Sequence, residues 1–134
     1  MSLPAARNDA PEVDDPRRVI ERWTEVWNEG RVEWIGELVA DPCLRHHPGK
    51  LDTLTTAENV DRVRAGRERF GRVSFENVVL VAAGEYVTSC YTMRFDDPDN
   101  PGVRRESAGI EVFRVVGGRI TETWNTDPGA GPWR

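Results

Sequence analysis

The sequence has few of the residues that metal and redox sites need. It contains only two cysteines and two histidines. Cys43 and Cys90 are too far apart for a closely spaced redox or zinc motif, so we expect neither a metal ion nor a cofactor. No apolar run approaches the ~18 residues of a membrane span, and no signal-peptide pattern is present. These absences predict a cytoplasmic protein with no membrane partner.

The sequence also has fewer basic than acidic residues. Its 134 residues carry 18 lysines and arginines against 23 acidic residues, which gives a net charge of −5. Because nucleic-acid binding needs clustered cations, we expect no nucleic-acid partner. The basic run Arg62, Arg64, Arg67 and Arg69 is interleaved with Glu58, Asp61 and Glu68, and we interpret it as a solvated helix face.

The order of patterns predicts one α+β domain. Residues 1–14 are polar and aperiodic, which is typical of a disordered tail, and residues 15–134 suffice for a single core. Asp15 and Thr55 are the expected helix N-caps. The expected helices cover 16–28, 32–40 and 56–69. The expected strands cover 43–47, 73–83, 86–96, 103–116 and 119–126. Helices followed by consecutive long strands indicate a curved antiparallel sheet covered by helices on one face.

The most informative segment is the terminal hairpin, residues 109–127. Its Gly117-Gly118 pair supplies the positive φ angles of a two-residue turn. Alternation places Glu111 on the same face as Phe113. It also places small polar or acidic residues on one face of the return strand, namely Thr121, Thr123, Asn125 and Asp127. A carboxylate among apolar neighbours is typical of an apolar pocket with a few polar groups. The alternative is that Glu111 faces water.

Three motifs resemble the nuclear transport factor 2-like superfamily: Trp-Asn-Glu-Gly at 27–30, His-His-Pro-Gly at 46–49, and the terminal GIEVFRVVGGRITETW. Within it, the chain is most similar to SnoaL-like polyketide cyclases and ketosteroid isomerase. The resemblance implies a cone-shaped α+β barrel, in which a curved sheet wraps three N-terminal helices around a deep, largely apolar cavity. It also implies a homodimer across the sheet's outer face, where Ile110, Val112 and Trp124 need cover.

The resemblance to ketosteroid isomerase implies roles at three positions. Its tyrosine donor corresponds to Trp23, its aspartate base to His47, and its second, protonated aspartate to Glu111. An indole donates a hydrogen bond but cannot transfer a proton as a phenol does, whereas imidazole is a base near neutral pH. Burial is expected to raise the pKa of Glu111, so that it serves as a neutral donor or general acid. Two alternatives stay open: His47 bonded to a backbone carbonyl at a strand edge, and an inert ion pair between His47 and Glu111.

Two other relatives bear on further positions. In SnoaL-like cyclases the working carboxylate follows the terminal tryptophan, where this chain has Asn125; Asp127 is the carboxylate that remains nearby. In limonene epoxide hydrolase an arginine and an aspartate stand where this chain has Tyr91 and Met93, so epoxide hydrolysis is not expected.

The predicted site therefore combines candidate catalytic residues with a ligand wall. The catalytic candidates are His47, Glu111 and Asp127. The candidate wall residues are Trp23, Trp27, Tyr91, Met93, Phe113, Thr123 and Asn125. The expected partner is a small apolar ligand.

Two classes of function follow from this site. An enzyme would enolise an apolar carbonyl compound for isomerisation, aldol cyclisation or dehydration. His47 would be the base, and Glu111 with Trp23 or Asn125 would hold the developing oxyanion. The alternative is a non-catalytic ligand-binding or dimerisation domain of the same fold, which Trp23 and Asn125 favour because they occupy two positions that are usually catalytic.

Overall fold

The computed structural model describes residues 15–134, and the predicted tail over residues 1–14 lies outside this range. The helices are α2 (Pro16–Glu29), the short 3₁₀ helix η1 (Val32–Trp34), α3 (Ile35–Leu38) and α4 (Thr56–Phe70). The strands are β1 (Val39–His47), β2 (Lys50–Leu54), β3 (Ser74–Ala83), β4 (Tyr86–Asp96), β5 (Arg104–Val116), β6 (Arg119–Asn125) and β7 (Gly129–Ala130). None of the helices over residues 15–134 is long and apolar enough to cross a membrane.

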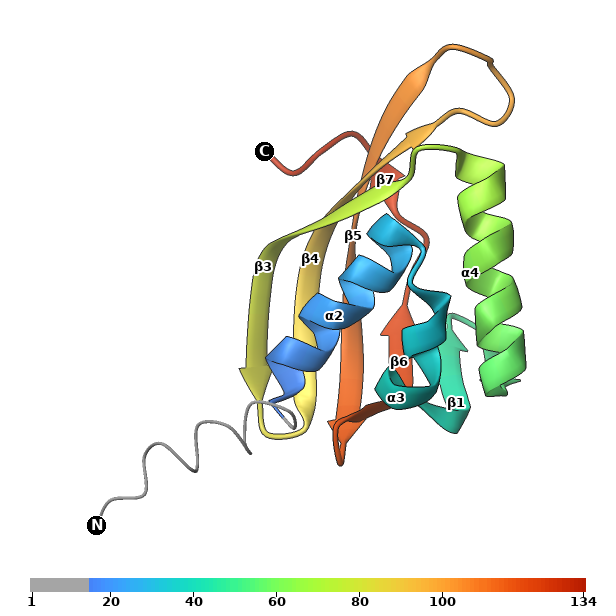
Figure 1. The fold of residues 1–134 in the computed structure, drawn as a ribbon. Coiled ribbons are helices and arrows are strands. Elements are labelled where there is room, and N and C mark those ends of the chain that lie inside the picture. Colours follow the sequence, from blue (N-terminus) through green and yellow to red (C-terminus); the bar gives the residue numbers. More distant parts are fainter. Residues whose placement is uncertain (1–14) are drawn as a thin grey trace, which may run out of the picture.

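The strands form one curved sheet in the order β2-β1-β6-β5-β4-β3, with β7 paired to β5. Figure 1 shows α2 crossing β3, β4 and β5, α3 in front of β6 and β1, and α4 beside β1. Apolar residues from α2, α3 and the inner sheet face form the core between the helices and the sheet. The expected α+β cone, with three helices packed against a curved sheet, is confirmed.

The prediction of a wholly antiparallel sheet is wrong at one pairing, because β1 runs parallel to β6. Parallel neighbours need a long crossover connection, and here the chain from β2 to β5 provides it. The sheet is therefore mixed, and β1 and β6, which are far apart in the sequence, lie side by side in it. This pairing brings Arg45 of β1 beside Thr123 of β6.

The helix boundaries follow local capping chemistry, as predicted. The Asp15 carboxylate accepts a hydrogen bond from the Arg17 amide, and Gly30 ends α2 in the left-handed conformation at φ 73°. Thr55 and Glu58 form a reciprocal capping box at the start of α4. These caps fix where α2 and α4 begin, and hence which side chains face the sheet.

The predictions failed where a helix meets a strand. Residues 39 and 40 were expected to end the second helix, but Val39 begins β1 and pairs with Ile120 of β6. The short strand β2 was also missed: Pro48 and Gly49 were expected only to end the strand at 43–47, but they form the turn of a β1–β2 hairpin. Buried apolar residues such as Val39 suit either element, and only pairing with a distant strand decides between them.

The β5–β6 hairpin turns at Gly117 and Gly118, whose φ angles of 59° and 79° confirm the expected two-residue turn. A bulge follows, because Val115 pairs with Ile120 while Arg114 pairs with Glu122. Thr121 is the extra residue, and its hydroxyl donates to the Arg114 carbonyl instead of continuing the Thr123 face.

Candidate functional site

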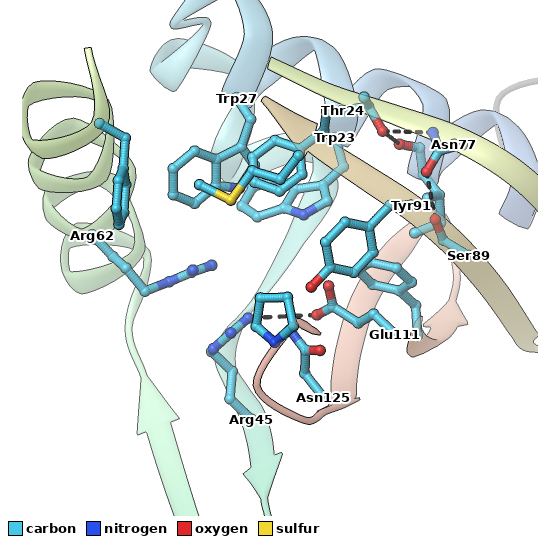
Figure 2. Close-up of a pocket in the computed structure, with 16 residues that line it drawn as sticks. Trp23, Thr24, Trp27, Arg45, Arg62, Asn77, Ser89, Tyr91, Glu111 and Asn125 are labelled. Carbon is cyan, nitrogen blue, oxygen red and sulfur yellow. Dashed lines mark hydrogen bonds and ion pairs between the residues drawn. The ribbon is translucent and has the colours of Figure 1, made fainter. Parts of the chain in front are cut away.

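A cavity of about 290 Å³ lies between the helices and the inner face of the sheet. Its apolar lining consists of Ile20, Trp23, Trp27, Phe70, Phe75, Tyr91, Met93, Phe113 and Pro128. Its polar lining consists of Thr24, Arg45, Arg62, Asn77, Ser89, Glu111 and Asn125. Figure 2 shows these side chains converging from α2, α4, β1 and the central strands.

Aromatic side chains make one side of this cavity. Trp23 and Trp27 are one helical turn apart on α2, so both face the sheet. The Trp27 ring meets Phe75 edge to face at 5.5 Å between centroids, and Phe75 lies 5.7 Å from Tyr91. Such packed rings offer a flat apolar ligand a large contact area.

Glu111 is the carboxylate of the cavity lining. Its Oε2 lies 3.8 Å from Nη1 of Arg45, and the two side chains are only 14% and 13% exposed. Burial raises the pKa of Glu111, and the positive charges of Arg45 and Arg62 oppose the rise. The sequence prediction of a desolvated Glu111 among apolar neighbours holds, whereas its partner is Arg45 and not His47.

The interpretation of the basic run as a solvated helix face holds for Arg64 and Arg69, which are exposed, and is wrong for Arg62. Its guanidinium points from α4 into the cavity (Figure 2) and lies 5.9 Å from the Trp23 ring and 5.5 Å from the Trp27 ring. Burial lowers the pKa of Arg62 to about 10, with Arg45 adding to the effect, so Arg62 stays charged at neutral pH.

Sequence reasoning missed Arg62 because its neighbours in the run are charged. The available signal was its spacing from Asn59 and Gly66, which share its face of α4. The Trp27 ring packs so closely on Gly66 that an added Cβ would lie 2.8 Å from it, and Arg67 donates to the Trp27 carbonyl. The face of α4 that carries Arg62 is therefore turned toward α2.

Tyr91 and Asn125 are the remaining polar groups near Glu111. Burial raises the pKa of the Tyr91 phenol, the Glu111 charge adds to this rise, and the Asn125 amide opposes it. The Asn125 Oδ1 atom is buried and has no hydrogen-bond partner within residues 15–134. Thr24, Asn77 and Ser89, in contrast, satisfy one another in a chain of hydrogen bonds of 2.9 and 2.6 Å at the back of the cavity.

Tyr91 reaches this position because residue 109 is glycine. A Cβ at Gly109 would lie 2.5 Å from the Tyr91 hydroxyl oxygen and 2.7 Å from the ring carbon that bears it. The absent side chain therefore leaves the space that the phenol occupies. The Tyr91 backbone carbonyl also accepts a hydrogen bond of 2.9 Å from the Trp133 indole.

Gly109→Ala should push the Tyr91 ring out of place. We expect a loss of about 1–3 kcal/mol in the free energy of unfolding, as is typical of overpacking. Urea denaturation measures this, and Gly129→Ala is the matched control because nothing lies within 4 Å of a Cβ there. Equal stability of both variants would mean that the phenol moves freely and is not held against Gly109.

The cavity brings most of the predicted wall residues together. Glu111, Trp23, Trp27, Tyr91, Met93, Phe113 and Asn125 all line it. Thr123 does not: it lies behind the cavity, at a small void of about 10 Å³ that Trp23 and Arg62 also border. The Thr123 hydroxyl is buried there without a hydrogen-bond partner among the described residues.

The structure corrects the placement of His47 and Asp127. Neither lines the cavity, and His47 borders a groove with Pro48 and Trp124, with its Nε2 atom 3.6 Å from Asp52. For His47 the reason is the length of β1, which passes the cavity at Arg45 and continues for two more residues. Asp127 lies after the end of β6, between the cavity residues Asn125 and Pro128, and does not itself line the cavity. Asp127 is exposed.

His46 points to the outer face of the sheet. Its ring stacks on Trp124 at 5.0 Å between centroids, and its Nε2 lies 2.6 Å from Glu122. Both contacts are made outside the cavity, so neither histidine contributes to the cavity lining. Residues 15–134 contain no group of three or more His, Cys, Asp or Glu side chains that could hold a metal ion.

The arrangement therefore combines one desolvated carboxylate with several hydrogen-bond donors in an aromatic cavity. Ionised, the carboxylate is a proton acceptor whose raised pKa makes it a stronger base than a solvated glutamate. Tyr91, Asn125 and the two guanidinium groups can donate to an oxygen that gains charge. The chemistry that these residues can perform is proton transfer.

Comparison with known proteins identifies the fold and the family. The sequence profile of the family described as SnoaL-like domain matches residues 20–123. No curated protein matches the chain in sequence. Among solved structures, IdmH, a proposed polyketide cyclase from Streptomyces antibioticus, is 22% identical, with 83% of this chain and 90% of that one covered and a TM-score of 0.73.

Two further bacterial structures have a similar fold. A proposed polyketide cyclase from Acidithiobacillus ferrooxidans is 25% identical over 93% of this chain and 89% of that one, with a TM-score of 0.72. A protein of ketosteroid isomerase-like fold from Catenulispora acidiphila, solved in complex with trimethylamine, is 15% identical over 80% and 82%, with a TM-score of 0.68.

Proposed function

Since the chain belongs to the SnoaL-like family of the nuclear transport factor 2-like superfamily, we propose that it binds a small, mostly apolar carbonyl compound and catalyses proton transfer beside the carbonyl group. The observation that carries the proposal is the desolvated carboxylate of Glu111 in an aromatic cavity. The names of the structural neighbours from Streptomyces and Acidithiobacillus, proposed polyketide cyclases, agree with a carbonyl substrate.

In this proposal Glu111 is the base. Its carboxylate takes a proton from the carbon next to the carbonyl, and the electrons of the broken C–H bond form the carbon–carbon double bond of an enolate. Tyr91 and Asn125 donate to the enolate oxygen as its charge develops. The enolate then takes the proton back at another carbon, which isomerises the compound, or attacks a second carbonyl carbon of the same molecule, which closes a ring. In the ring closure, the alkoxide formed at the second carbonyl takes the proton from Glu111.

The volume of the cavity restricts the substrate. Small-molecule sites span about 300–1,000 Å³, and a cavity of about 290 Å³ lies at the lower end. A compound of one or two rings therefore suits it better than a four-ring steroid. Trp27, Phe75 and Tyr91 would contact the faces and edges of such rings.

The alternative is a binding domain without chemistry. Its support is the ion pair of Arg45 and Glu111, which stabilises the ionised carboxylate and so weakens the base. Trp23, which cannot transfer a proton, also favours it. If the chain is such a binding domain, it should bind ligands without catalysing proton transfer.

The deciding experiment follows the exchange of α-protons for deuterium by NMR, with aromatic 1,3-diketones of one or two rings as probes. The proposed enzyme accelerates exchange above the rate in buffer. If probes that shift the tryptophan emission or the melting temperature are exchanged no faster than in buffer, the proposal is overturned and the binding domain is favoured.

We also propose that two copies of the chain associate through the outer face of the sheet. A groove of about 450 Å³ there is lined by Ile110, Val112 and Trp124, and Ile110 is 46% exposed. A second copy would cover these apolar side chains, as is usual for symmetric dimers.

Val112→Asp should dissociate this dimer, because burying an unpaired charge at an interface costs several kcal/mol. Analytical ultracentrifugation at micromolar concentration should give twice the chain mass of 15.1 kDa for the wild type and one chain mass for the variant. Val103→Asp, at an exposed position of the connection between β4 and β5 and outside the groove, is the control. A monomeric wild type would contradict the proposal.

A further inference from the structure

The charges of the cavity lining are unequal. Two guanidinium groups, those of Arg45 and Arg62, accompany the one carboxylate of Glu111. Arg45 is paired with that carboxylate, with its Nη1 3.8 Å from the nearer oxygen. If all three groups are ionised, the cavity keeps one positive charge in excess, and it belongs to Arg62.

The charge and the hydrogen-bond donors of Arg62 have few partners within the protein. Within residues 15–134 no carboxylate forms a salt bridge with it. Its Nε atom is buried and has no hydrogen-bond partner, and its one side-chain acceptor is Asn59 Oδ1, at the long distance of 3.5 Å. The faces of Trp23 and Trp27 offset only part of the cost of burying such a charge.

The position of Arg62 is that of a binding group and not of a surface charge. Figure 2 shows its guanidinium extending from α4 toward the centre of the cavity, opposite Tyr91 and Glu111. The Trp23 and Trp27 rings lie beside it, so that an apolar ligand body resting on these rings has its end near the guanidinium. A guanidinium donates two parallel, charge-assisted hydrogen bonds to a carboxylate, which add energy as well as a fixed geometry.

We propose that the natural ligand of this cavity is an organic monoanion, with a carboxylate that pairs with Arg62 and an aromatic or alicyclic body against Trp23 and Trp27. The inference rests on the proposed function only in that the same cavity holds the ligand. Combined with it, the substrate class is a keto acid: the carboxylate binds Arg62 while the ketone oxygen faces Tyr91 and Asn125, and the carbon to be deprotonated faces Glu111.

The test compares two probes of nearly equal shape, 2-naphthoate and 2-naphthamide, by calorimetric titration at pH 7. A charge-assisted pair with a buried guanidinium should make the wild type bind the carboxylate about 10- to 100-fold more tightly than the amide. This comparison needs no variant, so it holds whatever the effect of mutation on folding. Equal affinity for the two probes, tighter binding of the amide, or no binding of either probe at millimolar concentration would overturn the inference.

The contribution of Arg62 is then assigned with matched variants of α4. Arg62→Met should abolish the preference for the carboxylate, and Arg62→Lys should restore part of it. Arg64→Met, which removes an exposed arginine of the same helix, should leave the preference unchanged. A carboxylate preference that survives Arg62→Met would assign the anion to Arg45 or to the surface and contradict the proposed role of Arg62.

The exchange experiment fails independently of this one. A carboxylate preference without α-proton exchange would support the anion site at Arg62 and contradict the proposed catalysis. Exchange of neutral diketones without any carboxylate preference would support the catalysis and contradict the anion site.

Discussion

Glu111→Gln should lower kcat for α-proton exchange by about 10²–10⁴-fold, the usual contribution of a general base. The amide fills nearly the same space as the carboxyl group but cannot accept the proton. Ligand binding should change much less than kcat, because the ring contacts of Trp27, Phe75 and Tyr91 are untouched. Steady-state exchange rates with the diketone probes, together with calorimetric binding of the same probes, separate the two effects.

The pH profile identifies which form of Glu111 works. A base must be ionised, so the rate should rise with pH through the pKa of Glu111, which burial places above its ordinary value. A rate that falls over the same interval would mean that the neutral carboxyl group is the active form, acting as a hydrogen-bond donor.

Two controls accompany this variant. Glu122→Gln removes a carboxylate from the outer face of the same hairpin, where it contacts His46 and Arg114, and should leave kcat unchanged. His47→Ala should also have little effect, because His47 lies beside Asp52 and outside the cavity. Loss of activity in His47→Ala with full activity in Glu111→Gln would reverse the assignment of the base.

Much of this fold is encoded locally and could be predicted from the sequence. The caps at Asp15 and Thr55, the Gly117-Gly118 turn and the alternation through Glu111 and Phe113 each depend on a few neighbouring residues. The same alternation predicts that Phe113 and Asn125 share the cavity face. It cannot anticipate Thr121, because the bulge there is a property of the pairing between two strands.

The charged part of the site could not be predicted in the same way. Arg45 stands between Leu44 and His46 in a strand that looked short, and its approach to Glu111 results from the parallel pairing of β1 with β6. The residues around Arg62 are charged, as is typical of a solvated helix, and only the close packing of α4 on Trp27 turns Arg62 inward. The prediction that His47 is the base was wrong because it relied on residue type alone. Imidazole suits a base, but β1 extends past the cavity, and His47 lies at its far end.

The pairing of Arg45 with Glu111 leads to the second large effect. Arg45→Met should lower the free energy of unfolding by about 3 kcal/mol at neutral pH, because removing one partner leaves the other charge buried and uncompensated. This value is at the lower end for buried pairs, since Glu111 and Arg45 are 14% and 13% exposed and Arg62 also faces Glu111. Urea denaturation measures the loss.

The loss should depend on pH, with a sign that follows from Glu111. Because burial raises its pKa, the folded chain holds this proton more tightly than the unfolded chain, and the stability from this group falls as pH rises above about 4.3, the ordinary glutamate pKa. Arg45 limits that fall. Without Arg45 the pKa of Glu111 rises further, so the difference between wild type and Arg45→Met should be small near pH 4 and should grow toward neutral pH.

The double variant Arg45→Met, Glu111→Gln separates charge from packing. With no ionisable group left at position 111, its stability difference from the wild type should lose most of the pH dependence that Arg45→Met shows. Arg18→Met, which removes an exposed arginine from α2, should change stability by less than about 1 kcal/mol at any pH. If Arg45→Met loses the same free energy at pH 4 and at pH 7, the contribution of Arg45 is the packing of its aliphatic stem. In that case the charge of Arg45 does not stabilise the ionised form of Glu111, and the pH dependence predicted for this pair is wrong.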